Sequence, residues 1–187
     1  MTAAQLRLAI ILAGVLVAGL VLLAWTQTWF ELVLDGGQKL SVPGQAAAPA
    51  LSALGLASLA LVGALSIAGR GVRLALGIVE TAIGVSVMIV TIGVLSNPAA
   101  ASASTITATT AVSGPESIAA LITSTAVGAW PSLAIMAGVL TVVVGLAVVV
   151  TGRRWPGPTR KYEVTPSDDS GTPVGAWDRL SDGSDPT

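Results

Sequence analysis

Residues 72–95, which read VRLALGIVETAIGVSVMIVTIGVL, decide the fold class of this chain. A helix needs about 20 mainly apolar residues to cross the hydrocarbon core of a bilayer, and this stretch is long enough. After Arg73 its only charged side chain is Glu80. We therefore expect residues 72–95 to form a membrane-spanning helix with one acid inside it.

Three further stretches have the same length and apolar character, at residues 6–25, 49–68 and 131–151. The composition agrees, because 53% of the 187 residues are hydrophobic and only 10% are charged. The sequence therefore predicts an all-α integral membrane protein, a compact four-transmembrane-helix bundle. A secretory signal peptide is the alternative for residues 6–25, but their apolar run is long and no clear cleavage site follows it.

The basic residues predict how the chain is oriented and divided. Seven of the nine lie at the start of the first span, at the connection between the second and third, or shortly after the fourth: Arg7, Arg70, Arg73, Arg153, Arg154, Arg160 and Lys161. The long connections 26–48 and 96–130 together contain only one, Lys39. Because cytoplasmic segments carry the excess of Lys and Arg, we expect a multi-pass plasma-membrane protein with both termini in the cytoplasm. Residues 1–151 would form the transmembrane domain. Residues 152–187 would be a cytoplasmic tail, mostly disordered because it is rich in Pro, Gly and Ser.

This topology places the connections 26–48 and 96–130 outside the cell. In the first, FELVL and QKLSV flank the turn signal Asp35-Gly36-Gly37, which predicts a small hairpin. In the second, residues 96–114 are rich in Ala, Ser and Thr without a hydrophobic period, and we expect them to be flexible. An apolar helix over 116–129 would follow, too short to span and suited to the outer interface.

Small residues predict how the helices pack, because lipid tails give apolar helices no reason to associate. One face of the third span carries Gly77 and Gly84, and one face of the fourth carries Gly138 and Gly145. We predict that these two helices meet along a glycine seam, although the same faces would also suit a homo-oligomer. The second span has a looser small face that includes Ser58.

Glu80 is the only acid inside a predicted span, and such residues are candidates for function. In the functional interpretation it is a proton or cation site, within a polar group that includes Arg73 and Thr91. In the structural interpretation it pairs with Arg7, Arg73 or Arg153, or is protonated at the seam. The low polar content of the spans favours the structural interpretation.

The tryptophans suggest two different roles. Four lie at predicted helix ends, where aromatic residues anchor a protein in the bilayer interface: Trp25, Trp29, Trp130 and Trp155. In the tail, Trp177, Asp178 and Leu180 form a pattern typical of a short linear motif that becomes ordered on binding a protein partner. The alternative is a solvated tail whose Trp177 touches the membrane surface.

The composition excludes several kinds of chemistry. The chain has no Cys and no His, which rules out disulfides, thiolate nucleophiles and Ser-His-Asp catalysis. Phosphate-binding glycine loops, paired catalytic carboxylates and metal-ligand spacings are also missing from the sequence. We expect no enzymatic activity, no cofactor and no metal. The basic cluster RRWPGPTRK directly follows a span, where topology and anionic lipid explain it, so nucleic acid is not an expected partner.

Five motifs resemble those of one known family: WTQTWF, SVPGQAAAPALSALGLASLAL, WPSLAIMAG, GRRWPGPTRKYE and WDRLSDGSDPT. They cover the chain in outline, and the last two are the most specific. The chain resembles the tryptophan-associated transmembrane proteins of actinobacteria, whose genes lie among those for tryptophan biosynthesis. The resemblance implies four membrane helices and a plasma-membrane location, but no established reaction, substrate or functional residues.

Two functions remain open. In the first, the protein is a non-enzymatic scaffold, accessory or regulatory subunit that meets its partners through the helix faces and the tail. In the second, it is a small transporter or exporter of tryptophan, indole or a pathway precursor that uses Glu80. The tail and the segment beside the membrane hold most of the distinctive residues, which favours the first function.

Overall fold

The computed structural model of the chain describes residues 2–152 and 155. The chain divides into two compact units, Met1–Gly157 and Pro158–Thr187, and all described residues belong to the first. Apart from Gly152 and Trp155, the predicted tail, residues 152–187, lies outside the described residues.

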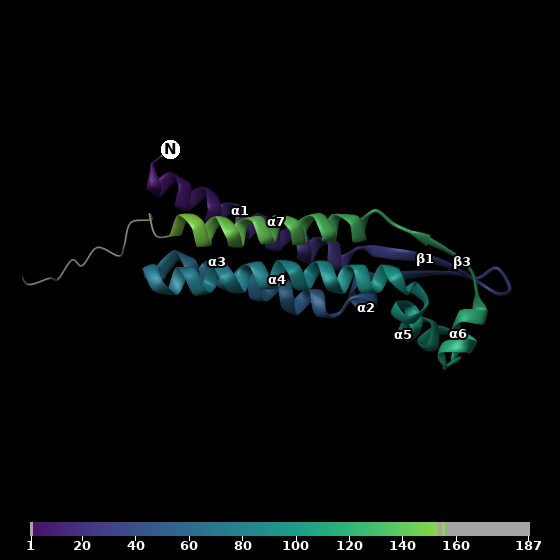
Figure 1. Cartoon of the computed structure of the whole chain (residues 1–187). Coiled ribbons are helices and arrows are strands. Elements are labelled where there is room, and N and C mark those ends of the chain that lie inside the picture. The colour runs from purple at the N-terminus through teal and green to yellow at the C-terminus, as the bar shows by residue number, and fades with distance from the viewer. Residues whose placement is uncertain (1, 153–154, 156–187) are drawn as a thin grey trace, which may run out of the picture. The chain divides into compact units, whose positions relative to one another are not determined.

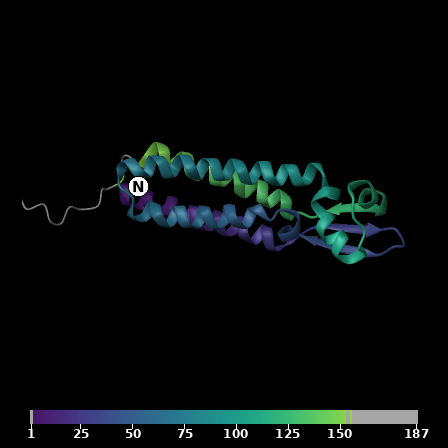
Figure 2. The same ribbon diagram turned by 90° about the horizontal axis from the view of Figure 1, so that it is seen from below.

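Four long helices dominate the first unit: α1 (Ala3–Thr26), α3 (Ala50–Ile67), α4 (Arg70–Ser96) and α7 (Trp130–Thr151). Each is long and apolar enough to cross a membrane. They run side by side in both ribbon views (Figures 1 and 2). The predicted fold class, a bundle of four candidate transmembrane helices, is confirmed.

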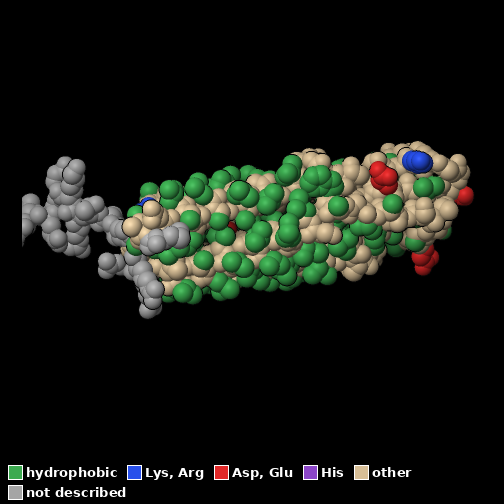
Figure 3. Space-filling model, turned by 90° about the horizontal axis from the view of Figure 1, so that it is seen from above, with side chains coloured by type: hydrophobic (Ala, Val, Ile, Leu, Met, Phe, Trp, Pro, Cys, Tyr) green, Lys and Arg blue, Asp and Glu red, His purple; other side chains and the backbone are tan. Residues whose placement is uncertain are grey.

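The helices contact one another in the ring α1–α3–α4–α7, and the contact between α4 and α7 is the most extensive. Figure 1 shows the start of α1 and the end of α7 at the same end of the bundle. Large apolar side chains cover the outside of the helices, among them Leu16, Ile67 and Ile89 (Figure 3). So much exposed apolar surface suits contact with lipid rather than with water.

Residues 27–49 and 97–129 form a small module at the opposite end of the bundle (Figure 1). The module includes a three-stranded sheet. Its strands are β1 (Thr28–Leu34), β2 (Lys39–Pro43) and β3 (Ile122–Val127), in the antiparallel order β2-β1-β3. The predicted hairpin is confirmed by β1 and β2, whose register pairs Phe30 with Val42. The turn between them needs Gly36 and Gly37, since both have φ above +80°, where a side chain would be strained.

The predicted flexibility of residues 96–114 is wrong, because most of them form α5 (Pro98–Thr110). The Asn97 side chain accepts a hydrogen bond from the Ala100 N–H and caps the helix, and Pro98 occupies its first turn. Ile106 is buried and ties the helix to the rest of the protein. Local capping and the packing of Ala101, Ala103 and Ile106 against the core therefore order a segment that has no hydrophobic period.

The predicted helix over 116–129 is only half correct. The structure has a helix α6 at Pro115–Leu121, followed by β3, which pairs with β1. Ile122, Thr123, Thr125 and Val127 are β-branched and suit a strand once a neighbouring strand offers its edge. A four-residue helix, α2 (Gly44–Ala47), links β2 to α3.

Candidate functional site

The four predicted seam glycines lie where α4 and α7 touch. A Cβ atom built on Gly84 would lie 2.7 Å from the Val142 nitrogen, and one on Gly138 would lie 3.1 Å from the Gly84 oxygen. About two helical turns nearer the start of α4, a Cβ on Gly77 would lie 3.0 Å from the Gly145 oxygen. The two backbones are therefore in direct contact, and only glycine allows this approach.

Glu80 lies inside the bundle with only 1% of its side chain exposed. Its partner is Ser58, near the middle of α3, whose Oγ donates a hydrogen bond of 2.6 Å to Glu80 Oε1. The other carboxyl oxygen, Oε2, is buried and has no hydrogen-bond partner within the described part of the chain. The sequence placed Ser58 on a small face but gave no signal of this bond, which depends on the contact between α3 and α4.

Arg73 is not the partner of Glu80. Its Nη1 donates to the backbone oxygens of Gly152 and Trp155, at 3.5 and 3.3 Å, and its guanidinium carbon lies 5.4 Å from the centroid of the Trp155 ring. Carbonyl groups at a helix C-terminus lack partners within the helix, and a cation there is favourable. Arg73 therefore ties the start of α4 to the end of α7.

The predicted polar group of Glu80, Arg73 and Thr91 does not assemble. Thr91 is buried, but its Oγ1 donates to the Val87 oxygen of its own helix at 2.8 Å. The three side chains are spread along α4, seven and eleven residues apart, which is about 10 and 16 Å of helix. Arg7 is also engaged elsewhere, since its Nη2 donates to the Ser66 oxygen. Arg153 lies outside the described residues.

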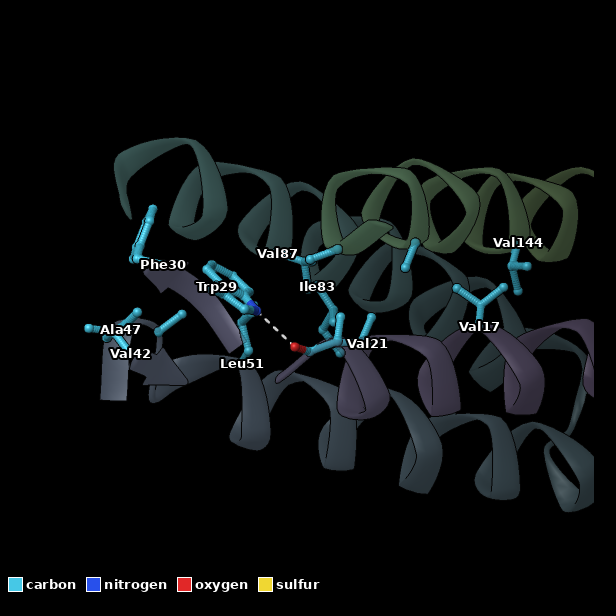
Figure 4. Packing of buried hydrophobic residues seen from close by; sticks show 14 of the residues in the cluster. Val17, Val21, Trp29, Phe30, Val42, Ala47, Leu51, Ile83, Val87 and Val144 are labelled. Carbon is cyan, nitrogen blue, oxygen red and sulfur yellow. Dashed lines mark hydrogen bonds between the residues drawn. The ribbon is translucent and has the colours of Figure 1, made fainter. Parts of the chain in front are cut away.

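Trp29 is buried in the protein rather than placed at its surface. Its side chain is 0% exposed, and its Nε1 donates to the Ala24 oxygen at 2.8 Å (Figure 4). A Cβ on Gly44 would lie 2.6 Å from Nε1, so the chain needs glycine there to pass the indole. A membrane anchor must touch lipid, so the predicted role does not fit Trp29.

Of the other three predicted anchors, one is buried and two are half-buried. Trp155 is 1% exposed beneath Arg73, and the anchor role does not fit it either. Trp25 and Trp130 are half-buried, at the end of α1 and the start of α7, so their role as interface anchors stays a prediction. Trp177, Asp178 and Leu180 of the predicted tail motif lie outside the described residues.

The module carries a hollow of about 760 Å³ between α5 and α6. Its lining is uncharged and consists mostly of small side chains, such as Ala100, Ser104 and Ala108. Within residues 2–152 and 155, no three His, Cys, Asp or Glu side chains come close enough to hold a metal ion. The chemically distinctive feature of the described structure is thus the Ser58–Glu80 contact.

These observations define the class of protein: a multi-pass α-helical membrane protein with four apolar helices and one buried acid among them. Comparison with known families matches residues 8–187 to the tryptophan-associated transmembrane proteins, and the chain belongs to this family. No curated protein and no solved structure matches it.

Proposed function

We propose that the protein is a non-enzymatic component of the plasma membrane that acts as a scaffold, accessory or regulatory subunit. Its family is described as tryptophan-associated, so its partners would serve the biosynthesis of tryptophan. The lipid bilayer surrounds the bundle, and a membrane or cytoplasmic protein binds through the tail.

The close packing of the bundle carries this proposal. The backbones of α4 and α7 touch at their glycines, and the acid between α3 and α4 is almost completely buried. Because its helices pack so closely, the bundle suits a structural role better than it suits a pathway for a solute. The seam glycines are also occupied within one chain, so they do not support a homo-oligomer. This leaves the tail as the favoured contact with partners.

Affinity purification of the tagged full-length protein from native membranes tests the proposal. We expect Trp177→Ala plus Leu180→Ala to lose a partner that the unchanged protein retains, because these side chains supply the apolar contact of the motif. A matched control, Val164→Ala plus Val174→Ala, also truncates two apolar tail residues and should keep the partner. If the motif variant retains every partner, the tail has no adaptor role.

One observation favours a second function, a small transporter or exporter of tryptophan, indole or a pathway precursor. Glu80 is an acid inside the bundle with an oxygen that no described residue binds, and such residues often mark transport pathways. Uptake of labelled tryptophan into liposomes separates the two functions. Transport by the unchanged protein that Glu80→Gln abolishes would replace the scaffold proposal with this one.

A further inference from the structure

Glu80 differs from the threonines of the bundle because its hydrogen-bond partner lies on another helix. Thr81, Thr91 and Thr141 each donate to the carbonyl four residues earlier in their own helix, with oxygen-to-oxygen distances of 2.8–2.9 Å. Such bonds satisfy a hydroxyl without a second helix. Glu80 instead takes its hydrogen bond from Ser58 across the α3–α4 contact and keeps Oε2 unbound by the described residues.

Among the side chains that the structure describes, no cation binds this carboxyl group. The sequences of α3 and α7 contain no charged residue, and α1 contains only Arg7, which donates to the Ser66 oxygen near the end of α3. On α4 itself, Arg73 is directed to the end of α7. Arg70 lies three residues further from Glu80 along the same helix. A carboxylate here would carry an uncompensated charge in an apolar interior, which is very unfavourable.

A bound metal cation is also unsuited to compensating the charge of a Glu80 carboxylate. Hard cations require about six oxygen ligands, whereas the hydroxyl of Ser58 is the one side-chain group that the described structure brings to Glu80. The other hydroxyls of the bundle named above are engaged with their own helices. A proton needs only one oxygen, and Oε2 is available for it.

We propose that Glu80 and Ser58 form a proton-binding site inside the membrane. A proton taken from water binds Oε2 as an O–H bond and makes the carboxyl group neutral, while Ser58 donates to the carbonyl oxygen Oε1. Release breaks that O–H bond, returns the proton to water and leaves the carboxylate behind. The α3–α4 contact covers the site, so exchange requires water to enter between these helices. This site goes beyond the scaffold function and does not depend on it.

Infrared spectroscopy of the full-length protein in liposomes at neutral pH tests the proposal. We expect the carbonyl band of a protonated carboxylic acid, with a downward shift when the acid exchanges its proton in D₂O. Glu80→Gln should lose this band. Glu31→Gln, which changes an exposed glutamate on β1 in the same way, should keep it. An unchanged protein without the band, or a band that survives Glu80→Gln, overturns the proposal.

Variants of Ser58 provide a test that does not need Glu80 to be replaced. Ser58→Ala removes the hydrogen bond to the carbonyl oxygen, so the acid band should remain and move to higher wavenumber. Ser58→Thr keeps a hydroxyl and should leave the band close to its original position. If Ser58→Ala leaves the band unmoved, the acid that gives rise to it is not the one described here. The test stays decisive if Glu80→Gln fails to fold.

Discussion

At the scale of the residue, Trp29 shows how a buried indole fixes the junction between bundle and module. Its Nε1–H is bound to the Ala24 oxygen, and its ring fills space beside Gly44. We expect Trp29→Phe to lower the free energy of unfolding by about 0.5–1.5 kcal/mol, because the indole bond to the Ala24 oxygen is lost while the Gln27 N–H still donates to that oxygen. Trp29→Ala should cost about 3–5 kcal/mol, because it also leaves a cavity. Thermal unfolding in detergent micelles measures both.

Trp130→Phe is the matched control for this prediction. Trp130 is half-buried at the start of α7, and none of the described hydrogen bonds involves its side chain. We expect a change within about 0.5 kcal/mol, as for other surface substitutions. Equal losses at both positions would show that Trp29 contributes general apolar contact rather than a specific bond.

At the scale of the element, the glycines of α4 allow the effect of helix packing on stability to be distinguished from the effect of helix propensity. A Cβ on Gly84 would meet the backbone of α7 at 2.7–2.8 Å, at the Val142 nitrogen and the Gly138 oxygen. Because backbone atoms cannot rotate away as a flexible side chain can, Gly84→Ala must push the two helices apart. We expect a loss of about 1–3 kcal/mol, measured by the same unfolding assay.

Gly93 lies on the same helix and provides the control, since a Cβ there would meet nothing within 4 Å. Gly93→Ala should be neutral or stabilising by up to about 1 kcal/mol, because alanine favours the helix. If both alanine variants behave alike, close contact between α4 and α7 does not stabilise the bundle.

At the scale of the whole molecule, the ends of the bundle differ in charge. Arg7 and Arg73 lie near the end that holds the start of α1 and the end of α7, whereas Lys39 belongs to the module. The excess of basic residues predicts that the first end faces the cytoplasm. Because the chain has no Cys, single cysteines can report this directly.

A membrane-impermeant maleimide added to intact cells measures the orientation. We expect Ser41→Cys, exposed on β2, to react without permeabilisation, and Thr2→Cys, exposed before α1, to react only after it. The opposite pattern would invert the predicted topology. Labelling of both in detergent controls for the reactivity of each cysteine.

Sequence alone identified the four helices, because length and apolarity are properties of each segment and the bilayer requires both. It also identified the β1–β2 hairpin, because Asp35-Gly36-Gly37 is a local turn signal. The glycine faces of α4 and α7 were visible as a periodic pattern of small residues. Each of these features depends on residues that are close together in the chain.

Only the tertiary structure decided the features that depend on a distant partner. Ile122–Val127 is a strand rather than a helix because β1 offers it an edge. Glu80 binds Ser58 rather than Arg73 because α3 brings the hydroxyl to it, while the end of α7 engages the arginine. Trp29 is buried rather than exposed to lipid because the chain passes over it at Gly44. The energy of these contacts comes from groups far apart in sequence, so no local pattern predicts them.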